Sequence, residues 1–315
     1  MNSRDAGPAK LVALVGPTAT GKTALGVALA EAVGGEIVSC DSTAVYRRID
    51  IGTDKPTSAE QRGIAHHLID VVDPTETYSA ARFASDAAVA IRDIRARGRR
   101  PILVGGTGFY YRALVRGLFP GPARNDELRA RLMHVSDRRG VEALHRWLAR
   151  VDPDSSARIQ PRDRMRLIRA LEVFLITGRP LTTHFAETQS ALAGWDVLAL
   201  AVMDPRPDLE SRVARRVEAQ FARGVVQEVE DLIAGGVPET AHAFSGLVYR
   251  QIIEMRQGVR DEPATRALIV RENMKYAKRQ VAWFRKEPSV RWLQGVGTDG
   301  AVQADALAQV QSWFS

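Results

Sequence analysis

Residues 11–23 read LVALV-GPTATGKT, an apolar run followed at residues 16–23 by the phosphate-binding pattern G-x-x-x-x-G-K-[ST]. Helix formers follow at residues 24–33, so the context is strand, loop and helix. Glycines in such a loop let consecutive N–H groups turn toward an anion, and the positive end of the helix adds to the field. Lys22 supplies a charge, and the Thr23 hydroxyl can complete the coordination of Mg²⁺. This context favours a phosphate site over an unliganded turn, for either a diphosphate or a nucleoside triphosphate.

Three further apolar runs, at residues 36–40, 101–105 and 197–202, are predicted to be strands of the same parallel sheet. The first strands alternate with helical patterns, which indicates an α/β fold with a P-loop NTPase-like core of three layers. Polar segments follow three strands, at residues 16–23, 41–43 and 105–107. Ligands of open α/β sheets bind at the carboxyl ends of the strands, so we expect these segments to converge on one site.

The stretch from Pro120 to about Gly194 differs in character, because it is helical in pattern and rich in arginine. It lies between the third and fourth predicted strands. The sequence therefore predicts a helical insertion at residues 122–193, within a core formed by residues 1–121 and 194–315.

Composition narrows the class of protein. The 315 residues carry a formal net charge of +7, which favours a polyanionic partner such as nucleic acid. No apolar stretch is long enough to span a bilayer and the first residues lack a secretory pattern, so we expect no membrane association. Cys40 is the single cysteine, which fits the cytoplasm and excludes a disulfide framework.

Two polar residues at predicted strand ends are candidates for chemistry. Asp41 could cap a following helix, bind magnesium through water, or act as a general base. Thr107 follows Gly105 and Gly106, which allow close backbone approach, and it could cap a helix as well as contact a ligand. The residues alone leave these roles open.

Basic side chains form three patterns. Arg212 and Arg216 share a helical face and could close over a phosphate, although a solvated basic face is the simpler interpretation. Arg162, Arg166 and Arg169 follow helical spacing in the insertion, which suits contact with a phosphate backbone. Residues 275–286 interleave basic and aromatic side chains, as RNA loops require, although Trp283 and Phe284 could equally be core residues.

Together, these segments resemble the tRNA dimethylallyltransferases (tRNA isopentenyltransferases, or IPP transferases), in the compact bacterial form. The resemblance extends over nearly the whole chain. The phosphate loop alone is unspecific, whereas its combination with the other motifs is highly specific. The matching stretches are GPTATGKT (16–23), SCDSTAVYRRIDIGTDKP (39–56), YSAARF (78–83), ILVGGTGFYYRAL (102–114), RLIRALEVF (166–174) and YAKRQVAWFR (276–285).

The resemblance implies transfer of a dimethylallyl group from dimethylallyl diphosphate to N6 of adenosine 37 of tRNA. It implies Asp41 as the base that accepts the amine proton, Thr107 as a hydrogen-bonding group at the reacting centre, and Mg²⁺ held near Thr23. A monomer suffices for this reaction. The implied diphosphate-binding residues are Gly16, Pro17, Thr18, Ala19, Thr20, Gly21, Lys22, Thr23, Arg212 and Arg216.

The second substrate implied by the resemblance is the anticodon stem-loop, whose target base must leave its stack to react. The residues expected to hold it are Asp41, Ser42, Thr43, Ala44, Met165, Arg166, Leu167, Ile168, Arg169, Tyr249, Arg250, Gln251, Lys278, Arg279, Gln280, Trp283 and Arg285.

One position departs from the family pattern. The family usually has glycine before the tyrosine of a G-Y-[RK]-[QE] motif, whereas Val248 precedes Tyr249 here. If that glycine has a positive φ, valine requires a backbone adjustment, part of which Gly246 could absorb.

Three other functions use some of the same residues. A small-molecule P-loop kinase would explain the loop and Asp41, but not the long basic C-terminal half. Prenyl transfer to free AMP or ADP would not need the arginine-rich insertion. An RNA-binding NTPase would explain the charge, but no helicase-like motif supports it.

Overall fold

The structure, a computed structural model, describes residues 8–119, 121–204 and 208–315. It divides into two compact units, one formed by Met1–Val115 with Ala191–Ser315 and the other by Arg116–Ser190. The two ends of the second unit meet, because Leu118 near its start pairs antiparallel with Gln189 near its end.

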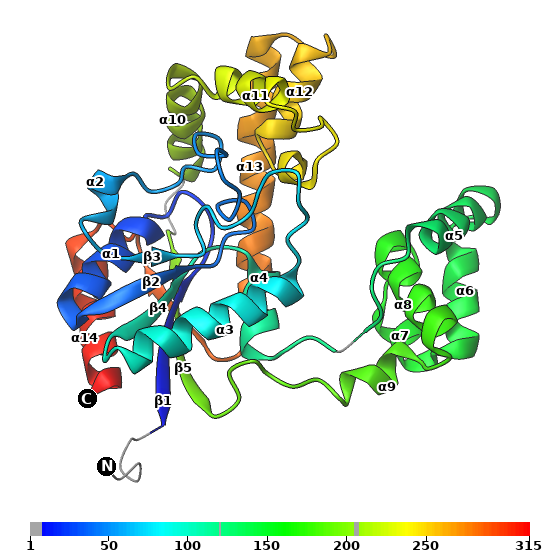
Figure 1. The fold of residues 1–315 in the computed structure, drawn as a ribbon, viewed down its shortest axis with the longest axis horizontal. Helices are drawn as coiled ribbons and strands as arrows, with labels where there is room; N and C mark the ends of the chain where they lie inside the picture. The colour runs from blue at the N-terminus through cyan, green and yellow to red at the C-terminus, as the bar shows by residue number, and fades with distance from the viewer. Residues whose placement is uncertain (1–7, 120, 205–207) are drawn as a thin grey trace. The chain divides into compact units, whose positions relative to one another are not determined.

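The first unit is built on a six-stranded parallel sheet in the order β3-β2-β4-β1-β5-β6 (Figure 1). The α/β prediction is confirmed. Four strands match the predicted apolar runs, whereas β3 and β6 were missed, because one has two residues and the other mixes polar with apolar side chains. The strands are β1 (Ala9–Val15), β2 (Gly35–Ser39), β3 (His66–His67), β4 (Arg100–Val104), β5 (Trp195–Met203) and β6 (Val290–Gln294).

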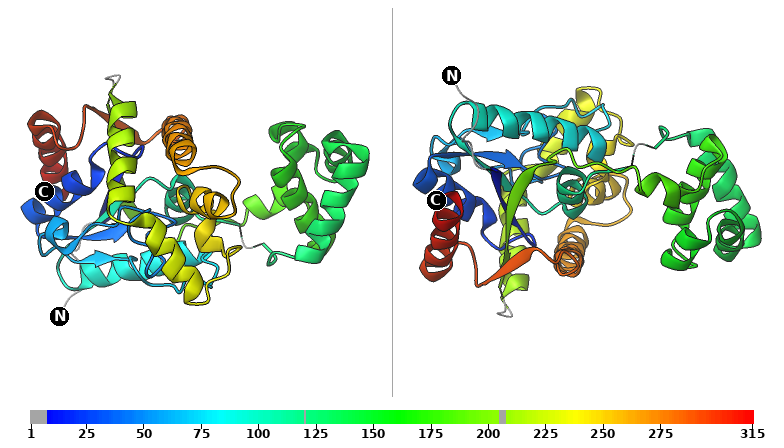
Figure 2. Two further views of the ribbon diagram at one scale, coloured as in Figure 1. Left: turned by 90° about the horizontal axis from the view of Figure 1, so that it is seen from above. Right: turned by 90° about the horizontal axis from the view of Figure 1, so that it is seen from below.

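Helices cover both faces of this sheet, which gives the three expected layers (Figure 2). On one side α1 and α14 pack over alternate strand residues such as Val12, Leu14 and Leu200. On the other side α3 buries Phe83 and Ile91 beside α4. Burial on both faces explains why β1 is apolar almost throughout. These helices are α1 (Lys22–Val33), α3 (Ala80–Ala96), α4 (Gly108–Val115) and α14 (Gly300–Phe314).

The remaining helices of the first unit follow the fifth strand, apart from the short α2 (Ser58–Gln61). The long helix α13 packs against α10, α12 and α4. In the described ranges, none of the helices combines the length and apolar character needed to cross a membrane. The group comprises α10 (Leu209–Ala222), α11 (Val225–Ala234), η1 (His242–Ser245), α12 (Tyr249–Arg256) and α13 (Glu262–Phe284).

The second unit is entirely helical. Its core includes Leu144, Leu148 and Leu171, and its buried Glu172 accepts hydrogen bonds from Arg129 at 3.0 Å and from Arg169 at 2.7 Å. Two guanidinium partners satisfy a carboxylate that would otherwise be costly to bury. The helices are α5 (Asp126–Arg139), α6 (Val141–Val151), α7 (Pro153–Arg158), α8 (Arg164–Thr177) and α9 (Leu181–Phe185).

Candidate active site

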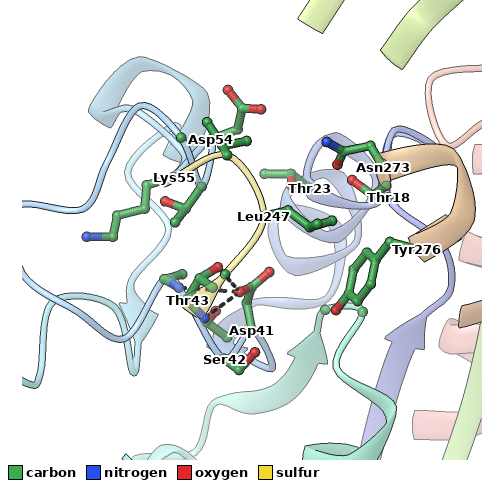
Figure 3. A pocket seen from close by; sticks show the side chains of 18 of the residues that line it. Thr18, Thr23, Asp41, Ser42, Thr43, Asp54, Lys55, Leu247, Asn273 and Tyr276 are labelled. Carbon is green, nitrogen blue, oxygen red and sulfur yellow. Dashed lines mark hydrogen bonds between the residues drawn. The ribbon is translucent and has the colours of Figure 1, made fainter. Parts of the chain in front are cut away.

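A pocket of about 820 Å³ opens at the carboxyl edge of the sheet in the first unit (Figure 3). The three polar segments that follow β1, β2 and β4 all contribute to its wall, as their positions at strand ends predict. Its remaining walls come from residues 52–56, residues 242–248 and one face of α13. The pocket therefore gathers loops from the whole length of the unit.

The phosphate loop has the backbone that its glycines predict. Gly16 has a φ of 128°, and a Cβ there would lie 2.8 Å from the Val202 carbonyl oxygen. Gly21 has a φ of 78° and immediately precedes α1, so the first N–H groups of that helix face the loop. The strand–loop–helix prediction for residues 11–33 is confirmed.

Lys22 lies at the first turn of α1 and donates a hydrogen bond to the Pro17 carbonyl oxygen. Burial, together with the charge of Arg216, lowers the pKa of Lys22 to about 7. A lysine with this pKa lacks a sufficient counter-charge in the free protein. An anion bound in the loop would supply that counter-charge and favour the protonated form.

Both predicted arginines of α10 reach the phosphate loop. Arg212 donates from Nε to the Ala19 carbonyl oxygen at 3.1 Å, and Arg216 donates to Thr18 Oγ1 at 2.5 Å. Their side chains are only 18% and 29% exposed, which rules out a solvated basic face. The buried Nη2 of Arg212 has no hydrogen-bond partner among the described residues. A cationic donor is thus available beside the loop.

Asp41 caps a turn through one carboxylate oxygen and keeps its other oxygen available. Its Oδ1 accepts hydrogen bonds from the Thr43 N–H at 2.8 Å, the Thr43 hydroxyl at 2.6 Å and the Ala44 N–H at 3.3 Å (Figure 3). These bonds cap a turn at residues 42–45 and not a helix. Within the described ranges Oδ2 has no hydrogen-bond donor, and the side chain lines the pocket. The carboxylate is therefore held by one oxygen and can accept a proton on the other.

Thr107 lies beside Asp41 because β2 and β4 are neighbours in the sheet. Its hydroxyl oxygen accepts the Ser42 N–H at 3.1 Å, and its own N–H donates to the Cys40 carbonyl oxygen at 3.2 Å. The hydroxyl thus points toward residues 41–42 and does not cap α4. A Cβ on Gly105 would lie 2.2 Å from the Cys40 carbonyl oxygen, so only glycine allows these two strand ends to approach.

Several pocket residues were not predicted from the sequence. Tyr276 hydrogen-bonds Thr107, and burial raises the pKa of its phenol to about 12, so it stays protonated. Tyr276 and Asn273 lie one and two turns, respectively, before Gln280 on the same face of α13, a spacing that could have identified them. Asp54 pairs with Arg216 and accepts from Gln220 at 2.9 Å. No local pattern indicated that last contact.

The wall formed by residues 50–55 is held by charges from distant segments. The Glu228 carboxylate accepts the N–H groups of Asp50 at 2.9 Å and Ile51 at 2.8 Å. Lys55 is buried between Asp50, at 2.6 Å, and Asp70, at 2.5 Å. Lys55 of the IGTDKP motif therefore supports the pocket wall through its ion pairs.

The basic and aromatic stretch of α13 divides between surface and interior. Lys278, Arg279 and Arg285 are exposed and available to a partner. Trp283 packs against Gly108, and the Arg112 guanidinium lies 4.8 Å from its ring centre, so it is largely a packing residue. Gln280 is buried, is hydrogen-bonded within the protein and lines the pocket wall, so it is not part of the exposed surface of α13.

The segment at residues 249–251 offers one side chain to a partner instead of three. Tyr249 is fully buried and donates to Glu228 Oε1 at 2.6 Å. Gln251 is buried and accepts the Val248 N–H at 2.8 Å. Only Arg250 is exposed and lines the pocket. The expectation that Tyr249 and Gln251 touch RNA is corrected by this burial.

A similar correction applies to residues 165–169 of the second unit. Met165 and Arg166 are exposed, whereas Leu167 and Ile168 are core residues with no exposed surface. Arg169 is turned toward the buried Glu172. Arg162 precedes α8, which begins at Arg164, so the expected stripe of three arginines on one helix does not form.

Comparisons of sequence point to one family. The family model for IPP transferase matches residues 44–287. A tRNA dimethylallyltransferase of Koribacter versatilis is 43% identical over 302 residues, which cover 96% of this chain and 98% of that protein. A second, of Thermomicrobium roseum, is 48% identical over 283 residues, which cover 90% of this chain and 85% of that protein.

Comparisons with solved structures point to the same family. The tRNA isopentenylpyrophosphate transferase of Bacillus halodurans is 34% identical with a TM-score of 0.71, and the match covers 97% of this chain and 98% of that one. A eukaryotic dimethylallyltransferase acting on tRNA is 26% identical with a TM-score of 0.76, and the match covers 96% of this chain and 77% of that one. The resemblance drawn from the motifs is confirmed. With a phosphate loop, an adjacent carboxylate and these relatives, the chain belongs to the IPP transferase family.

Proposed function

We propose that the protein transfers a dimethylallyl group from dimethylallyl diphosphate to N6 of adenosine 37 in tRNA and releases diphosphate. One observation carries the proposal: a carboxylate with an available oxygen, on Asp41, lines the same pocket as a phosphate loop surrounded by cations. A base and a leaving-group site in one pocket are what this displacement needs. The relatives named tRNA dimethylallyltransferase support the same reaction.

The two halves of the reaction have separate residues. As the bond from N6 to the allylic carbon forms, Asp41 accepts a proton from the amine. As the bond from that carbon to the diphosphate breaks, negative charge develops on the leaving group. Lys22, Arg216 and the free Nη2 of Arg212 would neutralise it, with the loop N–H groups. Thr107, held beside Asp41 by the Ser42 N–H, would hydrogen-bond at the reacting centre.

Magnesium fits the donor groups near the loop. Thr23 lines the pocket at the first turn of α1. Residues 8–119, 121–204 and 208–315 contain no cluster of three or more histidine, cysteine or acidic side chains placed to hold a metal. Mg²⁺ commonly shares its shell between few protein groups, water and substrate phosphates, so the Thr23 hydroxyl suits it. When bound, it would neutralise charge on the diphosphate.

The tRNA would be held by exposed cations of both units. Arg250, Lys278, Arg279 and Arg285 surround or follow the pocket wall, and Arg166 is exposed on the second unit. The net charge of +7 suits a polyanion. We infer that residues 122–193 contact the tRNA and that the enzyme works as a monomer in the cytoplasm, where its substrates occur.

The experiment supplies radiolabelled dimethylallyl diphosphate and Mg²⁺ with one of three acceptors. These are an anticodon stem-loop carrying A36-A37-A38, the same stem-loop with guanosine at position 37, and free AMP. We expect label only in the first. Label in AMP would indicate a nucleotide prenyltransferase. No transfer to any acceptor, with phosphate released from ATP, would indicate a kinase or NTPase and refute the proposal.

An Asp41→Asn variant tests the base. It should bind the stem-loop normally and lose turnover by about 10²-fold or more, because general-base catalysis is worth about 10²–10⁴-fold. The matched control is Asp305→Asn, since Asp305 is exposed on α14 and accepts a hydrogen bond from Gln309, within the same helix. Unchanged turnover in Asp41→Asn would remove Asp41 as the base.

A further inference from the structure

The carboxamide of Gln280 bridges the phosphate loop and the loop after β4. Its Oε1 accepts the Thr18 N–H at 2.8 Å, and its Nε2 donates to the Gly106 carbonyl oxygen at 2.9 Å. The orientation of the amide follows from these partners, because exchanging its oxygen and nitrogen would oppose two donors at one end and two acceptors at the other. Gln280 is 7% exposed, so water does not compete for either contact.

Space around the amide is also restricted. A Cβ on Gly106 would lie 2.3 Å from Gln280 Nε2, so glycine is required for this approach. Thr18 is braced from its other side, because Arg216 donates to its hydroxyl. The bridge therefore joins α13 to the phosphate loop in one defined arrangement.

This bridge occupies a donor that phosphate loops normally present to their ligand. Backbone N–H groups along the loop receive the phosphate oxygens, and Thr18 belongs to the half of the loop farther from α1. The Gln280 oxygen already takes this N–H. A phosphate oxygen at this position would therefore find the Thr18 N–H already bonded, and it would be repelled by the partial negative charge of Gln280 Oε1.

We propose that Gln280 is a specificity-determining residue that limits the loop to two phosphate groups and rejects triphosphates. The proposal rests on the phosphate loop being the diphosphate site of the proposed function. The N–H groups near α1, with Lys22, remain for a diphosphate. A third phosphate, extending toward Thr18, would meet the Gln280 oxygen. The same fold could thus exclude nucleoside triphosphates by one side chain.

The test compares the affinity of the full-length protein for inorganic diphosphate and inorganic triphosphate, both with Mg²⁺, by titration calorimetry. In the wild type we expect diphosphate to bind about tenfold or more tightly, in line with the penalty for an unpaired polar contact. Gln280→Ala should reduce this preference to about twofold or less, because the Thr18 N–H becomes available. Gln280→Met fills the same volume without the amide and should give the same ratio if the alanine variant is unstable.

Gln303 offers a matched control. Its Nε2 donates to the Gly297 carbonyl oxygen at 3.0 Å, and the Gly297 N–H donates to the Thr20 carbonyl oxygen at 2.7 Å. It therefore supports the same loop through a carbonyl and engages none of the loop's N–H groups. Gln303→Ala can lower stability but should leave the ratio of the two affinities unchanged, which separates specificity from a general structural effect.

The outcomes distinguish this inference from the proposed function. Equal binding of both anions by the wild type, or an unchanged ratio in both Gln280 variants, would overturn the inference while leaving the transferase proposal intact. Failure of the wild type to bind diphosphate at all would instead contradict the assignment of the loop.

Discussion

Val248 should be strained by its Cβ atom, and two substitutions can measure that strain. Its φ is 79° and its ψ is −61°, a region that β-branched residues rarely adopt. The position is buried, and the Val248 N–H is held by Gln251 Oε1 at 2.8 Å, so the backbone cannot relax freely. We compare Val248→Ala with Val248→Gly, because both remove the packed methyl groups and only glycine also removes Cβ.

The expected difference follows from two opposing effects. A residue with a Cβ in a left-handed conformation costs about 1–2 kcal/mol. Glycine lowers the free energy of unfolding by about 0.5–1 kcal/mol relative to alanine, because the unfolded chain is more flexible at glycine. We therefore expect Val248→Gly to be more stable than Val248→Ala by roughly 1 kcal/mol, or about 2 °C in melting temperature for a chain of this size.

Urea denaturation at neutral pH measures the two free energies of unfolding. Val259 is the matched control, because it is exposed and its φ is not positive. There the order should reverse, with the glycine variant about 0.5–1 kcal/mol less stable than the alanine variant. An alanine variant at position 248 that equals or exceeds the glycine variant in stability would refute the argument from strain.

Three other predictions concern charge and burial. Burial lowers the pKa of Lys22 to about 7, so this side chain loses its charge as the pH rises above 7. The Kd for dimethylallyl diphosphate should therefore increase by up to about tenfold per pH unit between pH 7 and 9 in a binding titration. Lys22→Arg stays charged and should show no such increase. Burial alone would raise the pKa of Glu172, but hydrogen bonds led by Arg129 lower it to about 2, so the second unit should lose stability as pH falls from about 5 toward 2. Glu172→Gln should lower the stability of this unit by about 3–5 kcal/mol at pH 7. The rate of limited proteolysis within residues 116–190 measures both effects. Tyr249→Phe should lower the free energy of unfolding by about 1–3 kcal/mol without changing the Kd for the stem-loop, because the lost hydrogen bond to Glu228 is internal. Arg250→Ala should weaken stem-loop binding in a filter assay, because Arg250 is exposed. The reverse pattern would indicate that Tyr249 contacts RNA.

Local patterns were sufficient to predict the phosphate loop and the two strand-end residues that lie beside each other. The glycine spacing of residues 16–23 and the flanking apolar and helical segments define the loop, whose conformation depends on neighbouring residues. Asp41 and Thr107 were found because each directly follows a strand of one parallel sheet, and neighbouring strands end at the same edge. Only the rule of strand ends was needed to place these two residues, 66 positions apart, beside each other at the edge of the sheet.

Predictions of exposure were weaker, because a short motif does not show which side of a segment faces the core. Tyr249 and Arg250 are adjacent, yet one is fully buried and the other exposed. Leu167 and Ile168 belong to a motif that resembles an RNA contact but pack in the core of their unit. The strands β3 and β6 were missed for a related reason, since their pairing with longer strands stabilises segments with little pattern of their own.

The sequence by itself determined the phosphate loop, the two strand-end residues and the family, because these depend on residue identity at short, fixed spacings. Only the tertiary structure decided that Arg212 and Arg216 reach the loop and that Gln280 is held between Thr18 and Gly106. Those contacts join residues that lie between 174 and 262 positions apart. Such contacts arise from the packing of α10 and α13 beside the sheet, where burial and hydrogen-bond satisfaction select one arrangement of side chains that local spacing leaves open.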